Sequence, residues 1–236
     1  MANWITHSRI ADELLKAGLP LDSRGFHVGS VAPDCNIPNA DWTSFTPSRE
    51  VTHWMTGESK TSADFEGFYR RYIDGRSFPN EEEYAFLLGY YVHLITDAAY
   101  QRFVRDETRV RQMFRRLRAN GELSAQITGM PETIDTVKSV FGKRRLFDDI
   151  ATMEAVYLRE NPNSGYLKWI CPLKEFPDYL SEFPKGAIPK KVAVMTVIPG
   201  GQTAGDELIF FSEEEYTHFL SDTIALALEK LRTKIQ

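Results

Sequence analysis

The chain has 236 residues, carries a formal net charge of −5 at pH 7 and is 42% hydrophobic. These values suit a single domain over residues 1–236 that buries a sizeable core, and the acidic balance disfavours a general affinity for nucleic acid or anionic lipid. Only two cysteines are present, Cys35 and Cys171, which argues against a disulfide framework and a cysteine-rich zinc site.

The sequence predicts neither a secretion signal nor a membrane span. The first 16 residues lack the continuous apolar stretch of a signal peptide. The longest strongly apolar stretch, around residues 84–96, is shorter than the about 20 residues that cross a bilayer. We therefore expect a cytoplasmic location, with both thiols reduced.

Capping residues and apolar spacing predict helices along most of the first half of the chain. Thr6 or Ser8 is expected to cap a first helix, and residues 20–50, rich in Pro, Asp, Asn, Ser and Gly, are expected to form an irregular loop. Residues 61–73 have helical spacing. The clearest helix covers residues 81–102, because three glutamates occupy its first turn, where carboxylates stabilise the helix dipole.

The second half is also predicted to be mainly helical. Helices are expected at residues 108–118, 131–140 and 146–159, and one short helix within residues 161–190. Residues 192–198 alternate and are β-branched, so with residues 208–211 they predict a small β excursion near residues 190–211. Ser212 and Glu215 form a capping pattern for a last helix that reaches about Leu231. The predicted fold class is therefore mainly all-α.

The most informative segment lies inside the helix predicted for residues 81–102. Positions four apart share one helix face, so His93 and Asp97 lie one turn apart, among mostly apolar neighbours. A carboxylate buried on such a helix must be ion-paired, hydrogen-bonded or bound to a metal. From this pair alone, a metal-chelating pair and a hydrogen-bonded core pair are equally good interpretations.

Three further residues have the chemical type to complete a metal site. His7 lies in the first predicted helix, Asp34 follows Pro33 in the predicted loop, and His53 precedes Trp54. Each of them alone is more often a capping or hydrogen-bonded structural residue. Histidine and carboxylate donors suit Zn²⁺, and they also suit iron or manganese.

Four sequence blocks together resemble the zinc-dependent phospholipase C family. They are Thr6-His7, Gly-Ser-Val-Ala-Pro-Asp-Cys at residues 29–35, Thr52-His53-Trp54, and residues 85–97, which end at Asp97. Their order and spacing agree with the family over residues 1–105. The chain is also similar to the N-terminal domain of glycosylphosphatidylinositol-specific phospholipase D, and the S1/P1 nucleases belong to the same superfamily. The resemblance implies a single multi-helix domain.

The resemblance also implies a ligand set and an activity. By it, Asp34, His53, His93 and Asp97 hold one zinc ion, and Asp97 bridges to a second ion that His7 binds. Asp34 would accept a proton from the attacking water. The expected activity is metal-dependent hydrolysis of a phosphate ester, either a small ester or a phospholipid, with one or two zinc ions.

Some positions depart from the family pattern. Gln101 stands where the family places another histidine, and Asp149 is the candidate for a later family carboxylate that here lacks its accompanying histidine. His27 is a candidate replacement ligand, although an ordinary loop histidine is the simpler interpretation. His218 and Asp222 repeat the one-turn spacing on the last predicted helix, where a solvated face is the better interpretation.

Two other functions remain open from the sequence. The same metal core serves nucleases and nucleotidases, so that activity is the alternative within enzymes. A non-catalytic protein with a structural metal site is the alternative outside them, and its function would lie in the basic run from Arg102 to Arg118. That run predicts either an anion-binding surface or a solvated helix face balanced by nearby acids.

Overall fold

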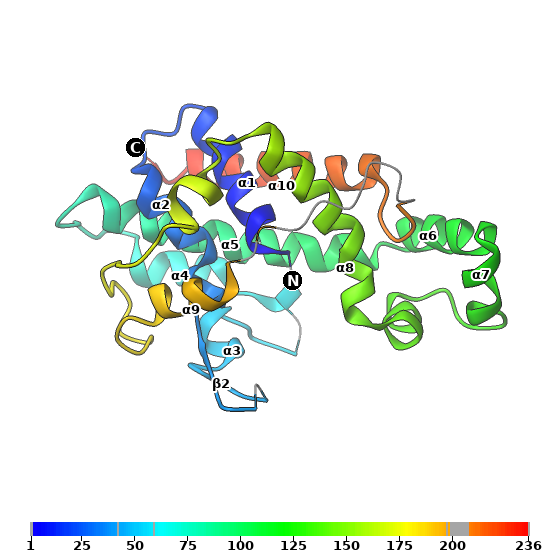
Figure 1. Ribbon diagram of the computed structural model, residues 1–236. Helices are drawn as coiled ribbons and strands as arrows, with labels where there is room; N and C mark the ends of the chain where they lie inside the picture. Colours follow the sequence, from blue (N-terminus) through cyan, green and yellow to red (C-terminus); the bar gives the residue numbers. More distant parts are fainter. Residues whose placement is uncertain (1, 42, 59, 197, 199–207, 236) are drawn as a thin grey trace.

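The computed structural model describes residues 2–41, 43–58, 60–196, 198 and 208–235, and it confirms a mainly all-α fold. One long buried helix, α5 (Glu81–Arg105), runs through the middle of the molecule, and α1, α2, α4 and α10 pack along it (Figure 1). The other α-helices are α1 (Trp4–Lys16), α2 (Ser23–Val31), α3 (Arg49–Thr52), α4 (Phe65–Tyr72), α6 (Glu107–Ala119), α7 (Gly121–Ser124), α8 (Ile134–Glu160), α9 (Ala187–Met195) and α10 (Glu213–Arg232). Short helical turns are η1 (Ala32–Asp34), η2 (Lys60–Ser62), η3 (Ala125–Ile127) and η4 (Tyr166–Ile170).

The helix ends largely follow local capping chemistry. The capping box of α10 is confirmed, with the Ser212 hydroxyl and the Glu215 carboxylate each bonded to the other residue's backbone N–H. The cap of α1 is Asn3 instead of the predicted Thr6 or Ser8, and the Asn3 side chain accepts from the Thr6 N–H. The two helices predicted within residues 131–159 form α8, which is kinked at Gly142, where φ is 80°. No described helix is both long and apolar enough to span a membrane.

Helix α2 lies where an irregular loop was predicted, so that prediction is wrong. Its glycines serve helix packing and do not break the helix. A Cβ atom on Gly29 would lie 2.0 Å from the carbonyl oxygen of Phe86 in α5, and one on Gly89 of α5 would lie 2.2 Å from that of Phe26. Only glycine permits this approach. The turn η1 directly follows α2 and ends at Asp34, so the close packing of α2 on α5 also positions Asp34.

The small sheet lies elsewhere than predicted. Strands β1 (Ile37–Pro38) and β2 (Phe45–Thr46) pair antiparallel, with Ile37 opposite Thr46. The β excursion expected near residues 190–211 is wrong for its described part, because α9 continues to Met195 and residues 208–211 form no strand. Short apolar alternation does not separate a strand from one buried helical turn. Residues 199–207 lie outside the described part of the chain.

Candidate metal centre

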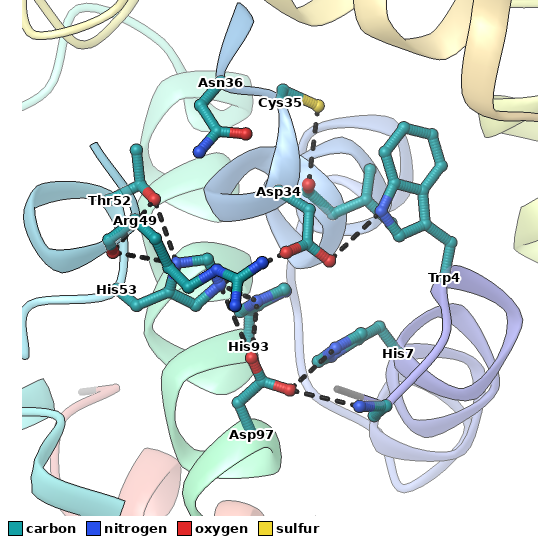
Figure 2. Close-up of polar contacts among 12 residues, drawn as sticks. Trp4, His7, Asp34, Cys35, Asn36, Arg49, Thr52, His53, His93 and Asp97 are labelled. Atoms are coloured by element: carbon teal, nitrogen blue, oxygen red, sulfur yellow. Dashed lines mark hydrogen bonds and ion pairs between the residues drawn. The ribbon is translucent and has the colours of Figure 1, made fainter. Parts of the chain in front are cut away.

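Five polar side chains from separate segments converge beside α5 (Figure 2). His93 and Asp97 project from α5, His7 from α1, and Asp34 ends η1, while His53 directly follows α3. All of them are at most 9% exposed. The structure thus brings together the five residues that the sequence singled out.

Asp97 lies at the middle of this cluster. Its Oδ1 atom lies 3.6 Å from Nε2 of His7, and its Oδ2 atom lies 3.4 Å from Nε2 of His93 and 3.5 Å from Nε2 of His53. The backbone N–H of Ala2 also donates to Oδ1, at 3.3 Å. The two carboxylate oxygens therefore face different imidazoles, as a bridging ligand would require.

The remaining distances extend the cluster toward Asp34. Nε2 of His53 lies 3.2 Å from Oδ1 of Asp34 and 3.3 Å from Nε2 of His93. Two sets of donor atoms lie within 4.8 Å of one another: one from His7, His93 and Asp97, the other from Asp34, His53 and His93. Nitrogen and oxygen donors at this spacing can surround a small cation.

Backbone carbonyls orient two of the imidazoles. Nδ1 of His93 lies 2.8 Å from the carbonyl oxygen of Ser30, and Nδ1 of His53 lies 3.2 Å from that of Arg49. A carbonyl can only accept, so Nδ1 of His93 carries a proton, whereas Nδ1 of His53 also lies 2.9 Å from the Thr52 hydroxyl, which can donate or accept. Nε2 of each ring faces the cluster, and a hydrogen bond at the other ring nitrogen is usual for metal-binding histidines.

His7 has the clearest unmet need for a partner. Its ring is stacked on that of His93, with centroids 3.9 Å apart, and neither ring nitrogen has a hydrogen-bond partner among the described residues. Burial and the nearby His93 lower the pKa of His7 to about 4, although Asp97 and Asp34 act in the opposite direction. His7 is therefore neutral at pH 7. A buried neutral imidazole without a partner suits a metal ligand.

A cleft of about 800 Å³ opens next to the cluster and is lined by Asp34 and His53. The indole N–H of Trp4 donates to Oδ2 of Asp34, at 3.3 Å, and so orients the carboxylate (Figure 2). His7, His93 and Asp97 do not line the cleft. The cluster thus has one side against the helical core and one side against an open cavity.

The three additional candidates occupy other surroundings. His27 contacts the Ser8 hydroxyl at 3.0 Å through Nδ1 and Asp12 at 3.3 Å through Nε2. Asp149 accepts the backbone N–H groups of residues 210 and 211. Gln101 lines the cleft, and its side chain accepts from Arg105. None of these three belongs to either donor set found among the described residues.

The basic run is mostly exposed, but two of its arginines bind within the protein. Arg109 is buried and donates to three backbone carbonyls, and Arg116 pairs with Glu215 while donating to the carbonyl of Ile209. Arg111 pairs with Glu107 on the exposed face of α6. The prediction of a solvated helix face is therefore wrong for Arg109, whereas the exposed Arg111–Glu107 pair fits it and Arg116 forms a partly buried ion pair.

Sequence reasoning did not single out Lys191, which lines the cleft from α9. A lysine carries no spacing signal of its own, and the surrounding residues were expected to form a loop and a strand. Its position follows only from the packing of α9 against the region of Asn36, whose carbonyl accepts from Lys191.

The helical fold and the buried histidine and aspartate donors define an all-α protein with a candidate transition-metal centre. Residues 5–100 match the family described as zinc dependent phospholipase C. This match confirms the predicted resemblance over a part of the chain that carries all five donors. Comparisons with curated proteins and with solved structures found no significant match.

Proposed function

We propose that the protein is a zinc-dependent phosphoric ester hydrolase that acts as a phospholipase C-like phosphodiesterase. The observation that carries this proposal is the convergence of His7, Asp34, His53, His93 and Asp97 in two donor sets beside an open cleft. A structural metal site is usually closed by protein ligands, whereas a catalytic one keeps a side open to substrate. Because Asp34 and His53 line the cleft, the geometry favours catalysis over the structural alternative.

The donors fit zinc. Three imidazoles and two carboxylates are nitrogen and oxygen ligands of the kind that zinc prefers, and the unpartnered nitrogens of His7 are consistent with an ion in this place. Zinc bound by these residues would supply Lewis acidity that stabilises negative charge on the oxygens of a phosphate ester. One or two ions fit the donor sets, since His93 belongs to both.

Asp34 is the proposed general base. Its carboxylate lies at the boundary between the cluster and the cleft, where a water molecule and an ester could meet it. Trp4 holds one oxygen through the indole N–H, and His53 lies beside the other. A carboxylate fixed in this way can accept the proton of an attacking water molecule.

The cleft wall suits an amphiphilic substrate. Apolar side chains of Trp4, Phe45, Leu146 and Phe147 line it together with cationic side chains. An apolar wall next to positive charge matches a phosphate ester that carries a hydrophobic group, such as a phospholipid. Helices α8 and α9, which contribute to this wall, lie beyond residue 100, and we propose that residues 1–236 act as one domain.

Metal content tests the proposal first. Protein purified without contact with affinity-tag metal is expected to contain one or two equivalents of zinc by elemental mass spectrometry. It should then hydrolyse members of a panel of phospholipids, phosphodiesters, phosphomonoesters and single-stranded nucleic acids, with activity lost on chelation and restored by zinc. Absence of zinc, with none taken up on addition, would refute the proposal, and preferential cleavage of nucleic acid would replace it with the nuclease alternative.

A further inference from the structure

A buried lysine from the C-terminal half of the chain reaches the cleft beside the candidate metal centre. Lys191 lies on α9, is 5% exposed, and lines the same cleft as Asp34 and His53. Its Nζ atom donates to the carbonyl of Asn36 at 2.9 Å, and lies 5.1 Å from the centre of the Phe45 ring. Its ammonium group is therefore held in place near Asp34.

Lys191 differs from the other cationic side chains of the cleft wall. Arg49 and Arg105 are exposed, and Lys138 pairs with Asp135 at 3.1 Å. Lys191 is instead buried, which is rare for a lysine, and its Nζ atom is fixed by the Asn36 carbonyl.

The charges around Lys191 favour its cationic form near Asp34. Burial lowers the pKa of Lys191, while the charge of Asp34 acts in the opposite direction. Asp34 is thus a nearby anion that favours the ammonium form.

We propose that Lys191 is a phosphate-binding residue of the cleft, holding the anionic oxygens of a phosphate ester beside Asp34. A lysine ammonium is a compact charge with several donors, which suits phosphate oxygens. The family match ends at residue 100, so it assigns no role to α9. The inference rests on the proposed function for the identity of the substrate, but the binding of inorganic phosphate tests it without turnover.

The decisive variant is Lys191→Met, with Lys190→Met as the matched control. Lys190 is the preceding residue of the same helix, does not line the cleft, and donates to the carbonyl of Lys185 at 3.2 Å. In zinc-loaded protein, Lys191→Met is expected to weaken inorganic phosphate binding by about tenfold or more in calorimetry. Lys191→Arg should retain most of the affinity, and Lys190→Met all of it.

Unchanged phosphate affinity in Lys191→Met, or an equal loss in Lys190→Met, would overturn the proposal. If Lys191→Met also loses zinc or thermal stability, NMR of the wild-type protein tests the proposal instead. With lysine labelled at Nζ, the signal of Lys191 should shift on titration with phosphate while that of Lys190 stays, and an unmoved Lys191 signal would overturn the proposal. A protein that binds phosphate through Lys191 but hydrolyses no ester would refute the proposed function alone.

Discussion

Two groups of buried charged side chains in this molecule satisfy their charges in different ways. Where α6 and α8 meet the segment before α10, Asp149 accepts the backbone N–H groups of Phe210 and Phe211 at 2.6 and 3.0 Å. Arg109 donates to the carbonyls of Val104 and Phe210 at 2.9 and 3.1 Å. Backbone groups thus meet each charge, and the cluster fastens one segment to its neighbours.

In the candidate metal centre, side chains face one another instead of backbone groups. Its imidazoles and carboxylates face one another, with Nε2 of His53 and Nε2 of His93 only 3.3 Å apart. The backbone carbonyl of Ser30 takes the Nδ1 proton of His93, and His7 has no hydrogen-bond partner among the described residues. Buried polar atoms without partners are costly. Backbone-satisfied charges are thus typical of structural roles, whereas converging imidazoles and carboxylates are the arrangement that a cation site requires.

The largest effects are expected from breaking the converging set. His93→Ala and Asp97→Asn should each remove most of the bound zinc, abolish hydrolysis and lower the melting temperature. Loss of an ion present at 100 times its dissociation constant lowers the free energy of unfolding by about 2.7 kcal/mol. Elemental mass spectrometry and calorimetry measure both quantities.

The matched control for these variants is His218→Ala. His218 and Asp222 repeat the one-turn spacing on α10, but His218 is exposed and both lie outside the two donor sets. This variant should keep its zinc. Full zinc content in both His93→Ala and Asp97→Asn would show that the converging side chains form only a hydrogen-bonded core.

The second effect separates catalysis from metal binding within the centre. Asp34→Asn keeps an oxygen donor but cannot take a proton, so hydrolysis should fall by about 10² or more while a measurable part of the zinc remains. Steady-state kinetics at matched zinc occupancy measure this loss. Wild-type activity in the variant would exclude Asp34 as the general base.

The sequence singled out the five converging residues because its strongest signals are local. Helix α5 follows from its acidic first turn and apolar spacing, and this places His93 and Asp97 on one face. The other donors could be named by residue type and by resemblance over the matched part of the chain. What brings them together, however, is packing between segments distant in sequence.

That packing explains what the sequence could not predict. Gly29 reads as a loop residue until its contact with the Phe86 backbone is known, so α2 was missed. Asp149 has a suitable chemical type for a ligand, but its partners are backbone N–H groups more than 60 residues away. Lys191 has no local signal at all, since its burial depends on where α9 packs.

A smaller and different effect is expected from the backbone-satisfied group. Arg109→Met removes a buried guanidinium and leaves carbonyls that had accepted from it, which should cost about 2 kcal/mol in the free energy of unfolding. Urea denaturation measures the loss. Zinc content per folded chain should not change, and a parallel loss of zinc would mean that the two buried groups are not independent.

The last effect is confined to the pH dependence of stability and concerns a third kind of buried ionisable group, Glu154 of α8. Its Oε1 atom accepts from the Thr6 and Tyr216 hydroxyls, and its Oε2 atom has no hydrogen-bond partner among the described residues. Burial raises the pKa of Glu154 from 4.5 to about 7. The folded state therefore binds this proton more tightly than the unfolded state does.

The sign of the pH dependence follows from that shift. Glu154 should contribute stability in full below pH 4.5, and this contribution should be lost as the pH rises to about 7. His7 acts in the opposite direction in metal-free protein, since its lowered pKa removes stability as the pH falls from 6.5 to about 4. The free energy of unfolding of Glu154→Gln, subtracted from that of the wild type at each pH, isolates the contribution of Glu154. The difference in free energy of unfolding should change by at most on the order of 3 kcal/mol between pH 4.5 and 8, and a constant difference would mean that burial does not raise the pKa of Glu154.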